Sequence, residues 1–198
     1  NCPRREMNFF QNLKYKIKYK NYFYMSFSGS GWNMCSNSIH FIDLFHFFIG
    51  RDKKINHHAN LENKILESKR SGFYEVKGNI KFFTNNFKET LFLLDTKKLS
   101  KYNILNIEFD EKKISVEINN KKNNVIIYKK GKIYKKKTFI MPLQSQITLG
   151  VVQKILKKDN CDLPTLSESY NYHKSLFLIF NNFFKNILNK KIINCPIT

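Results

Sequence analysis

The spacing of apolar residues predicts a helix at the start of the chain. Between Pro3 and about Lys18 they recur at steps of three and four, at Met7, Phe10, Leu13 and Ile17. This spacing lines them up along one side of a helix, and a proline suits the first helical turn.

A strand and a second helix are expected next. The run from Tyr22 is typical of a short strand, and the sequence GSGW at 29–32 is typical of a turn. Ser36 or Asn37 would then cap a helix that continues to Ile49. Gly50 would end this helix, because glycine readily adopts the left-handed conformation found at helix C-termini.

After a polar stretch at 51–64, the apolar period changes from 3.6 to 2, which indicates strands. Turn-forming residues recur at intervals near ten residues. The strand-like runs are YEVKGNIKF, TLFLLD, ILNIEFD, KISVEIN and NVIIYKK. This pattern predicts an antiparallel meander over 66–142 with one wetter face.

Helical spacing returns over 145–190. Thr165 and Glu168 have the spacing of a capping box, in which each side chain bonds the other residue's backbone N–H. Apolar stripes are expected at Ile147, Val151 and Ile155 in one helix, and at Tyr170, His173, Phe177, Phe180, Phe184 and Leu188 in the next.

These elements predict an α+β fold with a mostly antiparallel open sheet and helices packed on one face. We expect one domain over 1–198, in which a connecting helix at 1–20 precedes the meander at 66–142 and the C-terminal helices at 145–190. The other face of the sheet would be free for a partner.

The chain carries 35 Lys and Arg against 15 Asp and Glu, a formal net charge of +20. This charge suggests nucleic acid, but Lys outnumbers Arg 31 to 4 and Asn occurs 25 times, as A and T rich codons would produce. Recognition sites favour Arg, so a nucleic-acid partner is disfavoured. The lysine-rich run at 129–137 is better explained as a solvated edge strand and turn.

Cysteine spacing and hydropathy exclude several other classes. Cys2, Cys35, Cys161 and Cys195 form no CxxC pair, and no run is long and apolar enough for a membrane span. A reducing cytoplasm is the simplest setting. His57-His58 is more simply a solvated loop than a metal site, and we expect no metal. The sequence has no G-x-G-x-x-G, G-x-x-x-x-G-K or G-x-S-x-G motif.

Candidate chemistry is densest between Cys35 and Asp43. His40 and Asp43 are three positions apart on a helix, so both would reach a common point or each other. His40 is either a general acid or base, or a core histidine bonded to backbone with Asp43 as a local cap or ion-pair partner. His46 lies about 120° from His40 around the axis, which argues against a shared metal.

Four motifs, in this order, resemble the C-terminal half of Gfo/Idh/MocA oxidoreductases, the relatives of glucose-fructose oxidoreductase and inositol dehydrogenase. They are Asn1-Cys-Pro-Arg4-Arg5, Asn37-Ser-Ile-His40-Phe-Ile-Asp43, Ser68-Lys-Arg70-Ser-Gly-Phe-Tyr-Glu75-Val-Lys-Gly78, and Leu163-Pro-Thr165-Leu-Ser-Glu168-Ser169 with His173. The resemblance spans essentially the whole chain.

The resemblance implies a two-domain enzyme. An N-terminal Rossmann domain, absent from this sequence, would hold NAD or NADP and carry the Glu-Lys-Pro motif. The part present would bind a sugar or nucleotide-sugar substrate and form a homodimer through its open sheet. The implied parent is an NAD(P)-dependent sugar oxidoreductase of carbohydrate or surface-polysaccharide precursor metabolism, and this chain alone would be inactive.

The resemblance also implies residue roles. His40 would act in proton transfer, while Ser36, Asn37, Asp43 and Arg70 would bind substrate. Many relatives write the motif as Asp-x-Gly-x-His, so that Ser36 stands where they have Asp and Ser38 where they have Gly. Asn37 would then hydrogen-bond a substrate hydroxyl.

Arg4 and Arg5 would approach the cofactor or a substrate phosphate, and an ordinary ion pair at the helix start is the alternative. For the whole chain, the alternative functions are a non-catalytic remnant of such an enzyme or a basic nucleic-acid-binding module.

Overall fold

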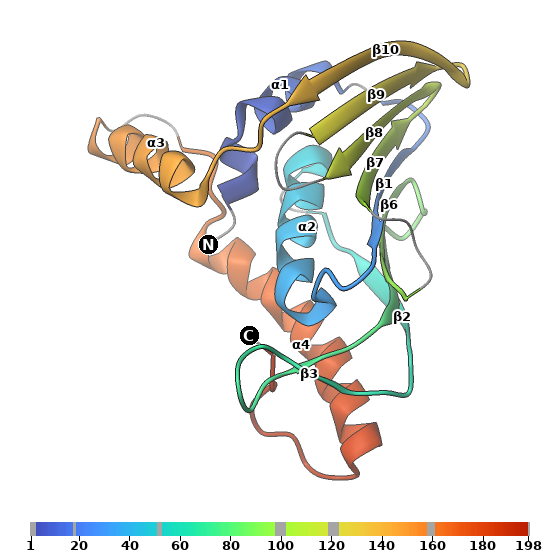
Figure 1. Ribbon diagram of the computed structural model, residues 1–198, viewed down its shortest axis with the longest axis vertical. Helices are drawn as coiled ribbons and strands as arrows, with labels where there is room; N and C mark the ends of the chain where they lie inside the picture. The colour runs from blue at the N-terminus through green and yellow to red at the C-terminus, as the bar shows by residue number, and fades with distance from the viewer. Residues whose placement is uncertain are drawn as a thin grey trace.

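The computed structural model describes residues 3–17, 19–50, 53–97, 102–118, 123–157 and 161–197. An eight-stranded sheet forms one layer, and helices pack against one of its faces (Figure 1). The helices are η1 (Pro3–Glu6), α1 (Asn8–Lys16), α2 (Met34–Ile49), α3 (Gln144–Leu156) and α4 (Leu166–Leu188).

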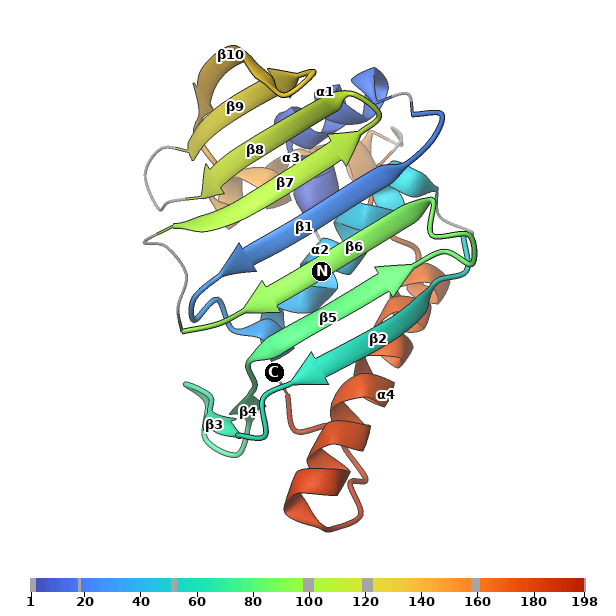
Figure 2. The ribbon, with the colours of Figure 1, turned by 90° about the vertical axis from the view of Figure 1, so that its right-hand side faces the viewer.

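The strand order in the large sheet is β10-β9-β8-β7-β1-β6-β5-β2. These strands are β1 (Phe23–Gly29), β2 (Asn56–Leu61), β5 (Gly78–Phe83), β6 (Glu89–Asp95), β7 (Asn103–Phe109), β8 (Lys112–Ile118), β9 (Asn123–Lys129) and β10 (Lys132–Phe139). Two short strands, β3 (Leu66–Glu67) and β4 (Tyr74–Glu75), form a separate ribbon. Figure 2 shows the large sheet face on, with the helices behind it.

The expected fold class is confirmed, with two differences from the expected meander. Strand β1 lies between β6 and β7 and runs parallel to β6, so it divides the consecutive antiparallel neighbours into two groups, β5 with β6 and β7 to β10. The sheet also includes β2, which comes from the polar stretch predicted as a loop. His57 and His58 are exposed, but they lie on this edge strand, because backbone pairing with β5 does not require apolar side chains.

The expected strand from Tyr74 to Phe82 is divided in two. Tyr74 and Glu75 belong to β4, and the chain joins the large sheet only at Gly78. Gly78 has a φ of 128°, and a Cβ atom there would lie 2.7 Å from the Leu61 Cα atom and closer still to the Asn60 carbonyl oxygen. The close approach of the end of β2 to the start of β5 therefore requires glycine at position 78.

The core lies between the sheet and α2. Phe27 on β1 stacks on Phe41 of α2 at 3.9 Å between ring centroids, and Phe23 packs against Phe45. Helix α2 is buried on almost every side, because the sheet covers one flank and η1 and α4 cover others. Met7, Phe10 and Leu13 of the predicted first stripe are buried, whereas Ile17, the fourth residue of that stripe, is half-buried and follows the end of α1 at Lys16.

The ends of the helices follow the sequence only in part. The capping box of α4 is confirmed: the Thr165 N–H donates to Glu168 Oε2 at 2.6 Å, and the Glu168 N–H donates to Thr165 Oγ1 at 3.2 Å. Gly50 ends α2 with a φ of 109°. The prediction of Ser36 or Asn37 as the cap of α2 was wrong, because the helix already begins at Met34.

The apolar face of α4 is rotated from the predicted stripe. Tyr170 is 63% exposed, whereas Tyr172, Leu176, Ile179, Phe180 and Phe184 are buried. In α3 only Ile147 of the predicted stripe is buried, and Ile155 is 57% exposed. Helix α3 stands away from the sheet in Figure 1, so little of the molecule covers it.

The lysine-rich run behaves as predicted. It covers the end of β9, a turn at Lys130-Gly131, and the exposed edge strand β10. Within the described residues, Cys35, Cys161 and Cys195 form no disulfide. No helix of the described chain is long and apolar enough to cross a membrane.

Candidate functional site

The N-terminus of α2 is held by a carboxylate from a distant segment. Glu75 on β4 accepts hydrogen bonds from the N–H groups of Cys35, at 2.7 Å, and Ser36, at 3.2 Å, and from the Ser36 hydroxyl. These N–H groups have no partner within the helix, so Glu75 does what a capping side chain would otherwise do. Burial raises the pKa of Glu75, and its bonds to Ser36 and Cys35 oppose this shift.

A second carboxylate holds the turn before α2. Asp95, at the end of β6, accepts from the N–H groups of Gly31 at 2.8 Å and Trp32 at 3.1 Å. The Trp32 indole donates to the Leu94 carbonyl at 2.9 Å. Asp95 therefore holds the turn at Gly31 and Trp32, and Glu75 holds the first turn of α2 that follows it.

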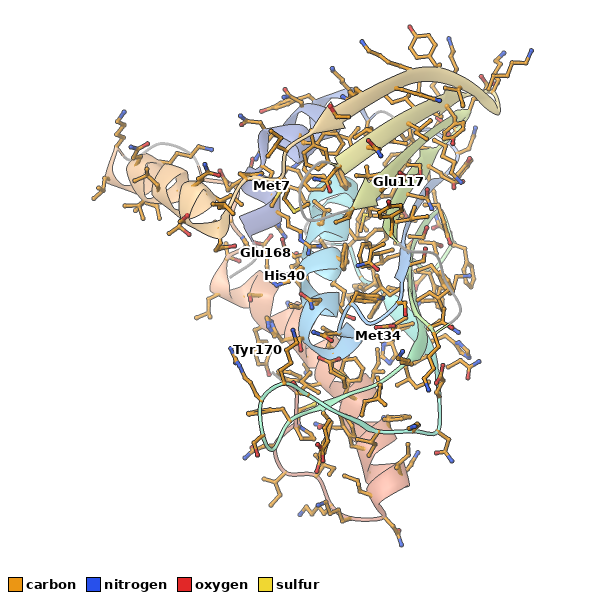
Figure 3. The ribbon with its side chains drawn as sticks, viewed as in Figure 1. Met7, Met34, His40, Glu117, Glu168 and Tyr170 are labelled. Carbon is orange, nitrogen blue, oxygen red and sulfur yellow. The ribbon has the colours of Figure 1, made fainter. Side chains whose placement is uncertain are left out.

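His40 lies in the second turn of α2, partly exposed, on the side of the helix that faces the start of α4. Figure 3 shows it together with Glu168 and Tyr170 of that helix. Its Nδ1 atom is buried and has no hydrogen-bond partner among the described residues. Burial, together with the neighbouring charges of Arg4 and His173, lowers the pKa of His40 to about 4. His40 is therefore neutral at pH 7.

Two of the predicted substrate residues lie close to His40 in the sequence of α2. The Asn37 amide nitrogen donates to the carbonyls of Trp32, at 2.8 Å, and Asn33, at 3.3 Å, which leaves the Asn37 Oδ1 atom as an acceptor. Ser36 is half-buried and bonded to Glu75. Ser36, Asn37 and His40 thus follow one flank of α2, since residues three and four apart lie side by side on a helix.

The spacing predicted that Asp43 and His40 would reach each other or a common point. In the structure Asp43 instead pairs with Arg5. Its carboxylate lies 2.7 Å from the Arg5 guanidinium, and both side chains are fully buried. Tyr172 of α4 completes the cluster, because its hydroxyl lies 3.5 Å from Arg5 Nη2. Burial raises the pKa of Asp43 to about 6, while the charge of Arg5 opposes this shift. The geometry matches the ion pair that the sequence left open as an alternative for Arg5.

Arg4 and Arg70 lie nearer the surface. The Arg4 guanidinium lies 4.2 Å from the centre of the Phe41 ring, on the side of α2 where it lowers the pKa of His40. Arg70 is exposed in the turn of the β3–β4 ribbon, the same ribbon that carries Glu75. The structure therefore groups Arg4 with His40 and pairs Arg5 with Asp43, and it places Arg70 outside both groups.

No role was predicted for Glu75, Asp95 or Tyr172. Glu75 stood in a quoted motif, but strict alternation made it an outward-facing strand residue. No spacing in the sequence indicated that Glu75 caps α2, because Ser36 and Asn37 were expected to do so and Asn33 is also a favourable capping residue. Among the described residues, no three His, Cys, Asp or Glu side chains lie together in a way that would hold a metal ion.

Solved proteins that share this fold include dehydrogenases, a 3-ketoreductase and Gal80p. UDP-N-acetylglucosamine 3-dehydrogenase GnnA from Acidithiobacillus ferrooxidans is 11% identical, with a TM-score of 0.60 over 89% of this chain and 58% of its own. KijD10, a 3-ketoreductase from Actinomadura kijaniata solved with TDP-benzene and NADP, is 15% identical, with a TM-score of 0.57 over 89% of this chain and 58% of its own.

Gal80p from Saccharomyces cerevisiae, solved as a super-repressor mutant, is 12% identical, with a TM-score of 0.57 over 99% of this chain and 64% of its own. No protein-family description matches the sequence, and no curated protein is significantly similar to it. The chain spans about three fifths of the solved proteins that it matches. The expected resemblance is confirmed for the fold: the chain has the fold of the C-terminal domain of Gfo/Idh/MocA-type dehydrogenases.

Proposed function

We propose that this chain is the substrate-binding and dimerising C-terminal part of an NAD(P)-dependent oxidoreductase that acts on a sugar or nucleotide-sugar in the cytoplasm. The observation that carries the proposal is the position of His40. It is a neutral, partly exposed histidine beside Asn37, on a helix whose start is fixed by two carboxylates. GnnA and KijD10 support the substrate class, because their names describe a nucleotide-sugar dehydrogenase and an NADP-bound ketoreductase.

The chain's own residues fit only the substrate side of such a site. The sequence has no dinucleotide-binding motif, and Arg5 is already paired with Asp43, so Arg4 is the predicted cofactor residue that remains near His40. A nicotinamide held mainly by another domain would supply the hydride exchange. Binding and orientation of the sugar, and the movement of one proton, are the tasks left to this chain.

His40 would carry that proton. Its buried Nδ1 leaves Nε2 as the nitrogen available to a ligand. In alcohol oxidation the substrate hydroxyl gives its proton to His40, and in ketone reduction the proton returns to the oxygen. An imidazole with a pKa of about 4 is almost wholly unprotonated at pH 7, so it is free to accept the proton of a substrate hydroxyl.

Asn37 would orient the substrate beside His40, and Arg70 would contact it from the β3–β4 ribbon that also carries Glu75. The Oδ1 atom of Asn37 can accept a hydrogen bond from a sugar hydroxyl on the flank that holds His40, because only the Asn37 amide nitrogen donates to the Trp32 carbonyl. Ser36 and Glu75 would together stand in for the aspartate that many relatives have at position 36, since the Glu75 carboxylate meets the Ser36 hydroxyl there. Asp43 and Arg5 would act indirectly, through the position of α2.

The open face of the sheet would bind a second copy of the chain. Phe23, Met25 and Phe27 point toward α2, so Tyr24, Ser26 and Ser28 point to the uncovered face visible in Figure 2. The register places further half-buried apolar side chains on this face, at Phe92, Leu94, Ile104 and Ile126. A mixed apolar and polar surface of this kind is typical of a protein interface.

The test of His40 uses the complete enzyme. We expect His40→Ala to lower kcat by about 100-fold or more with NAD or NADP and a nucleotide sugar such as UDP-N-acetylglucosamine. His57→Ala, on the exposed edge strand β2, is the matched control and should leave turnover unchanged. Unchanged turnover in His40→Ala would remove His40 from the mechanism.

A non-catalytic role is the second candidate. It is favoured by the serine at position 36 and by Gal80p, which shares the fold and was solved as a super-repressor mutant. It predicts that the native protein shows no cofactor-dependent turnover of any nucleotide sugar while still forming a dimer. Detectable hydride transfer by the native protein would exclude it.

A further inference from the structure

A groove lies between α1 and the ends of strands β7 to β10, on the face of the sheet that the helices cover (Figure 2). Its volume is about 610 Å³. The apolar part of its lining consists of Leu13 from α1 and Phe109, Ile114 and Ile127 from the sheet. Leu13, Phe109 and Ile114 are buried, so these side chains form the floor of the groove. The lining includes none of the residues assigned to the site around His40.

Four lysines surround this apolar floor, namely Lys16, Lys112, Lys129 and Lys137. The described lining contains no Asp or Glu, and none of the four lysines forms an ion pair with another described residue. Lys112 and Lys129 lie directly opposite each other in the register of β8 and β9. Like charges at such positions destabilise a sheet, so the groove holds a cluster of positive charge that its own walls do not neutralise.

The lysines of an adjoining hollow are arranged differently. In a chain with 31 lysines, an unpaired lysine is not unusual by itself. In the hollow between the β7–β8 and β9–β10 turns, however, Lys113 lies 2.9 Å from the Glu108 carboxylate, and Lys130 lies 3.6 Å from that of Glu111. The carboxylates next to the groove are therefore paired with other lysines, and the abundance of lysine does not explain why those of the groove are left without counterions.

A β-bulge on the edge strand adds an aromatic ring to the groove. Along β10 the register with β9 passes from Ile133 directly to Lys135, so Tyr134 is an extra residue that falls outside it. Bulges redirect side chains on edge strands. Tyr134 lines the groove, while its ring remains 72% exposed. An apolar surface that a ligand can cover is thereby placed on a strand whose other side chains are mostly lysines.

The ammonium groups lie close to the aromatic rings and to one another. Lys137 Nζ lies 5.4 Å from the centre of the Phe9 ring, and Lys112 Nζ lies 5.6 Å from that of Phe109. Burial lowers the pKa of Lys137, and the charge of Lys16 acts in the same direction. An anion bound between these ammonium groups would offset their mutual repulsion.

Charge and apolar surface together identify the class of ligand. Inorganic phosphate would use the ammonium groups but not the apolar floor, and a neutral lipid would use the floor but not the ammonium groups. A nucleotide base needs several hydrogen-bonding partners, whereas Asn12 supplies the one amide side chain of the described lining. An aliphatic chain that ends in a carboxylate uses both parts, because its CH₂ groups leave water and its carboxylate pairs with lysine.

We propose that this groove binds a medium-chain aliphatic carboxylate such as decanoate, with the chain on the apolar floor and the carboxylate among Lys112, Lys129 and Lys137. The volume of about 610 Å³ is within the range of small-molecule sites, about 300–1,000 Å³. The proposal does not depend on the oxidoreductase function, because the groove and the His40 site have no residue in common.

The test is calorimetric titration of the native protein, without cofactor, with octanoate, decanoate and dodecanoate below their micelle concentrations. We expect one saturable site whose Kd falls about two- to fourfold for each CH₂ group added, as burial of the chain requires. The Kd should rise with salt, because the carboxylate pairs with partly exposed lysines. Decanol and inorganic phosphate, each of which has only half of the required chemistry, should bind at least tenfold more weakly than decanoate.

Variants on β10 locate the site, and the fold should tolerate them because the substituted side chains are exposed. Lys137→Gln should weaken decanoate binding at least fivefold, whereas Lys136→Gln, which removes the same charge from the opposite face of the strand, should not. Tyr134→Ala should weaken binding several-fold, and Ile133→Ala is its control.

Three results would overturn the proposal. The first is a Kd that does not change with chain length, and the second is phosphate binding as tight as that of decanoate. The third is equal binding by each variant and its control, which would mean that the carboxylate is held by the general positive charge of the chain and not by this groove.

Discussion

The Arg5 guanidinium lies 2.7 Å from the Asp43 carboxylate, and neither side chain has any exposed surface. Arg5 belongs to η1 and Asp43 to the middle of α2, and the Tyr172 hydroxyl of α4 lies 3.5 Å from the same guanidinium. One buried charge pair therefore ties the start of the chain to both helices beside the candidate site. Burial raises the pKa of Asp43 even with Arg5 beside it, so desolvation outweighs the attraction.

This balance predicts an asymmetric response to mutation. Arg5→Met alone should destabilise the fold by about 3–5 kcal/mol, because it leaves a buried carboxylate without a counterion. Arg5→Met combined with Asp43→Leu should recover most of that loss. Urea unfolding of the single and double variants measures the difference. Equal stabilities of the single variant and the parent would show that the pair is not buried as described.

The Glu75 anchor predicts a loss of stability at the start of α2. Glu75→Gln keeps the side-chain shape but removes the negative charge of the carboxylate that accepts from the N–H groups of Cys35 and Ser36 and from the Ser36 hydroxyl. We therefore expect the free energy of unfolding to fall by about 1.5–3 kcal/mol. Glu67→Gln is the matched control, since Glu67 lies on the same ribbon and is exposed. A similar cost in both variants would argue against the anchor.

His46 predicts a stability difference that depends on pH. The folded state keeps His46 neutral down to about pH 4, whereas the unfolded chain protonates it near its ordinary value of 6.5. Between these values the unfolded state binds more protons, so acidification favours unfolding. His46→Phe lacks this contribution, and its advantage over the parent should grow by up to about 1.4 kcal/mol per pH unit below 6.5.

Thermal unfolding of the parent and His46→Phe from pH 7.5 to 5 provides the measurement. Other groups, including Asp43 with its raised pKa, titrate in both proteins and cancel in the difference. A difference that stays constant over this range would mean that His46 is not held neutral by burial.

The proposed dimer predicts sensitivity to charge on the open face. Phe92→Lys places a cation at the centre of that face, on β6, and should convert the dimer to a monomer at micromolar concentration. Ile155→Lys adds the same charge on α3, where the side chain is already 57% exposed, and should leave the dimer intact. Light scattering distinguishes these outcomes, and a Phe92→Lys dimer of unchanged affinity would place the interface elsewhere.

The features that could be predicted from the sequence are those set by residues close together in the chain. The stripe from Met7 to Leu13 and the Thr165 capping box follow from spacings of three and four residues. The order of β7 to β10 follows from turns between alternating runs. The edge position of the lysine-rich run follows from its charge.

Long-range pairing was not predictable in the same way. Strand β1 enters the sheet parallel to β6 across more than 60 residues, and nothing in either strand specifies this partner. Strand β2 is polar because it lies at an edge, so hydropathy did not reveal it. The pairing of Asp43 with Arg5, and of Glu75 with the start of α2, likewise depends on segments that only the complete fold brings together.

The central claim, that this chain is one part of a larger two-domain oxidoreductase, is tested most directly by the intact mass of the native polypeptide from its source cells. The account predicts a mass greater than 23.7 kDa by one nucleotide-binding domain of about 100–150 residues. A native mass of 23.7 kDa would contradict it, because the protein would then have no domain to hold the nicotinamide.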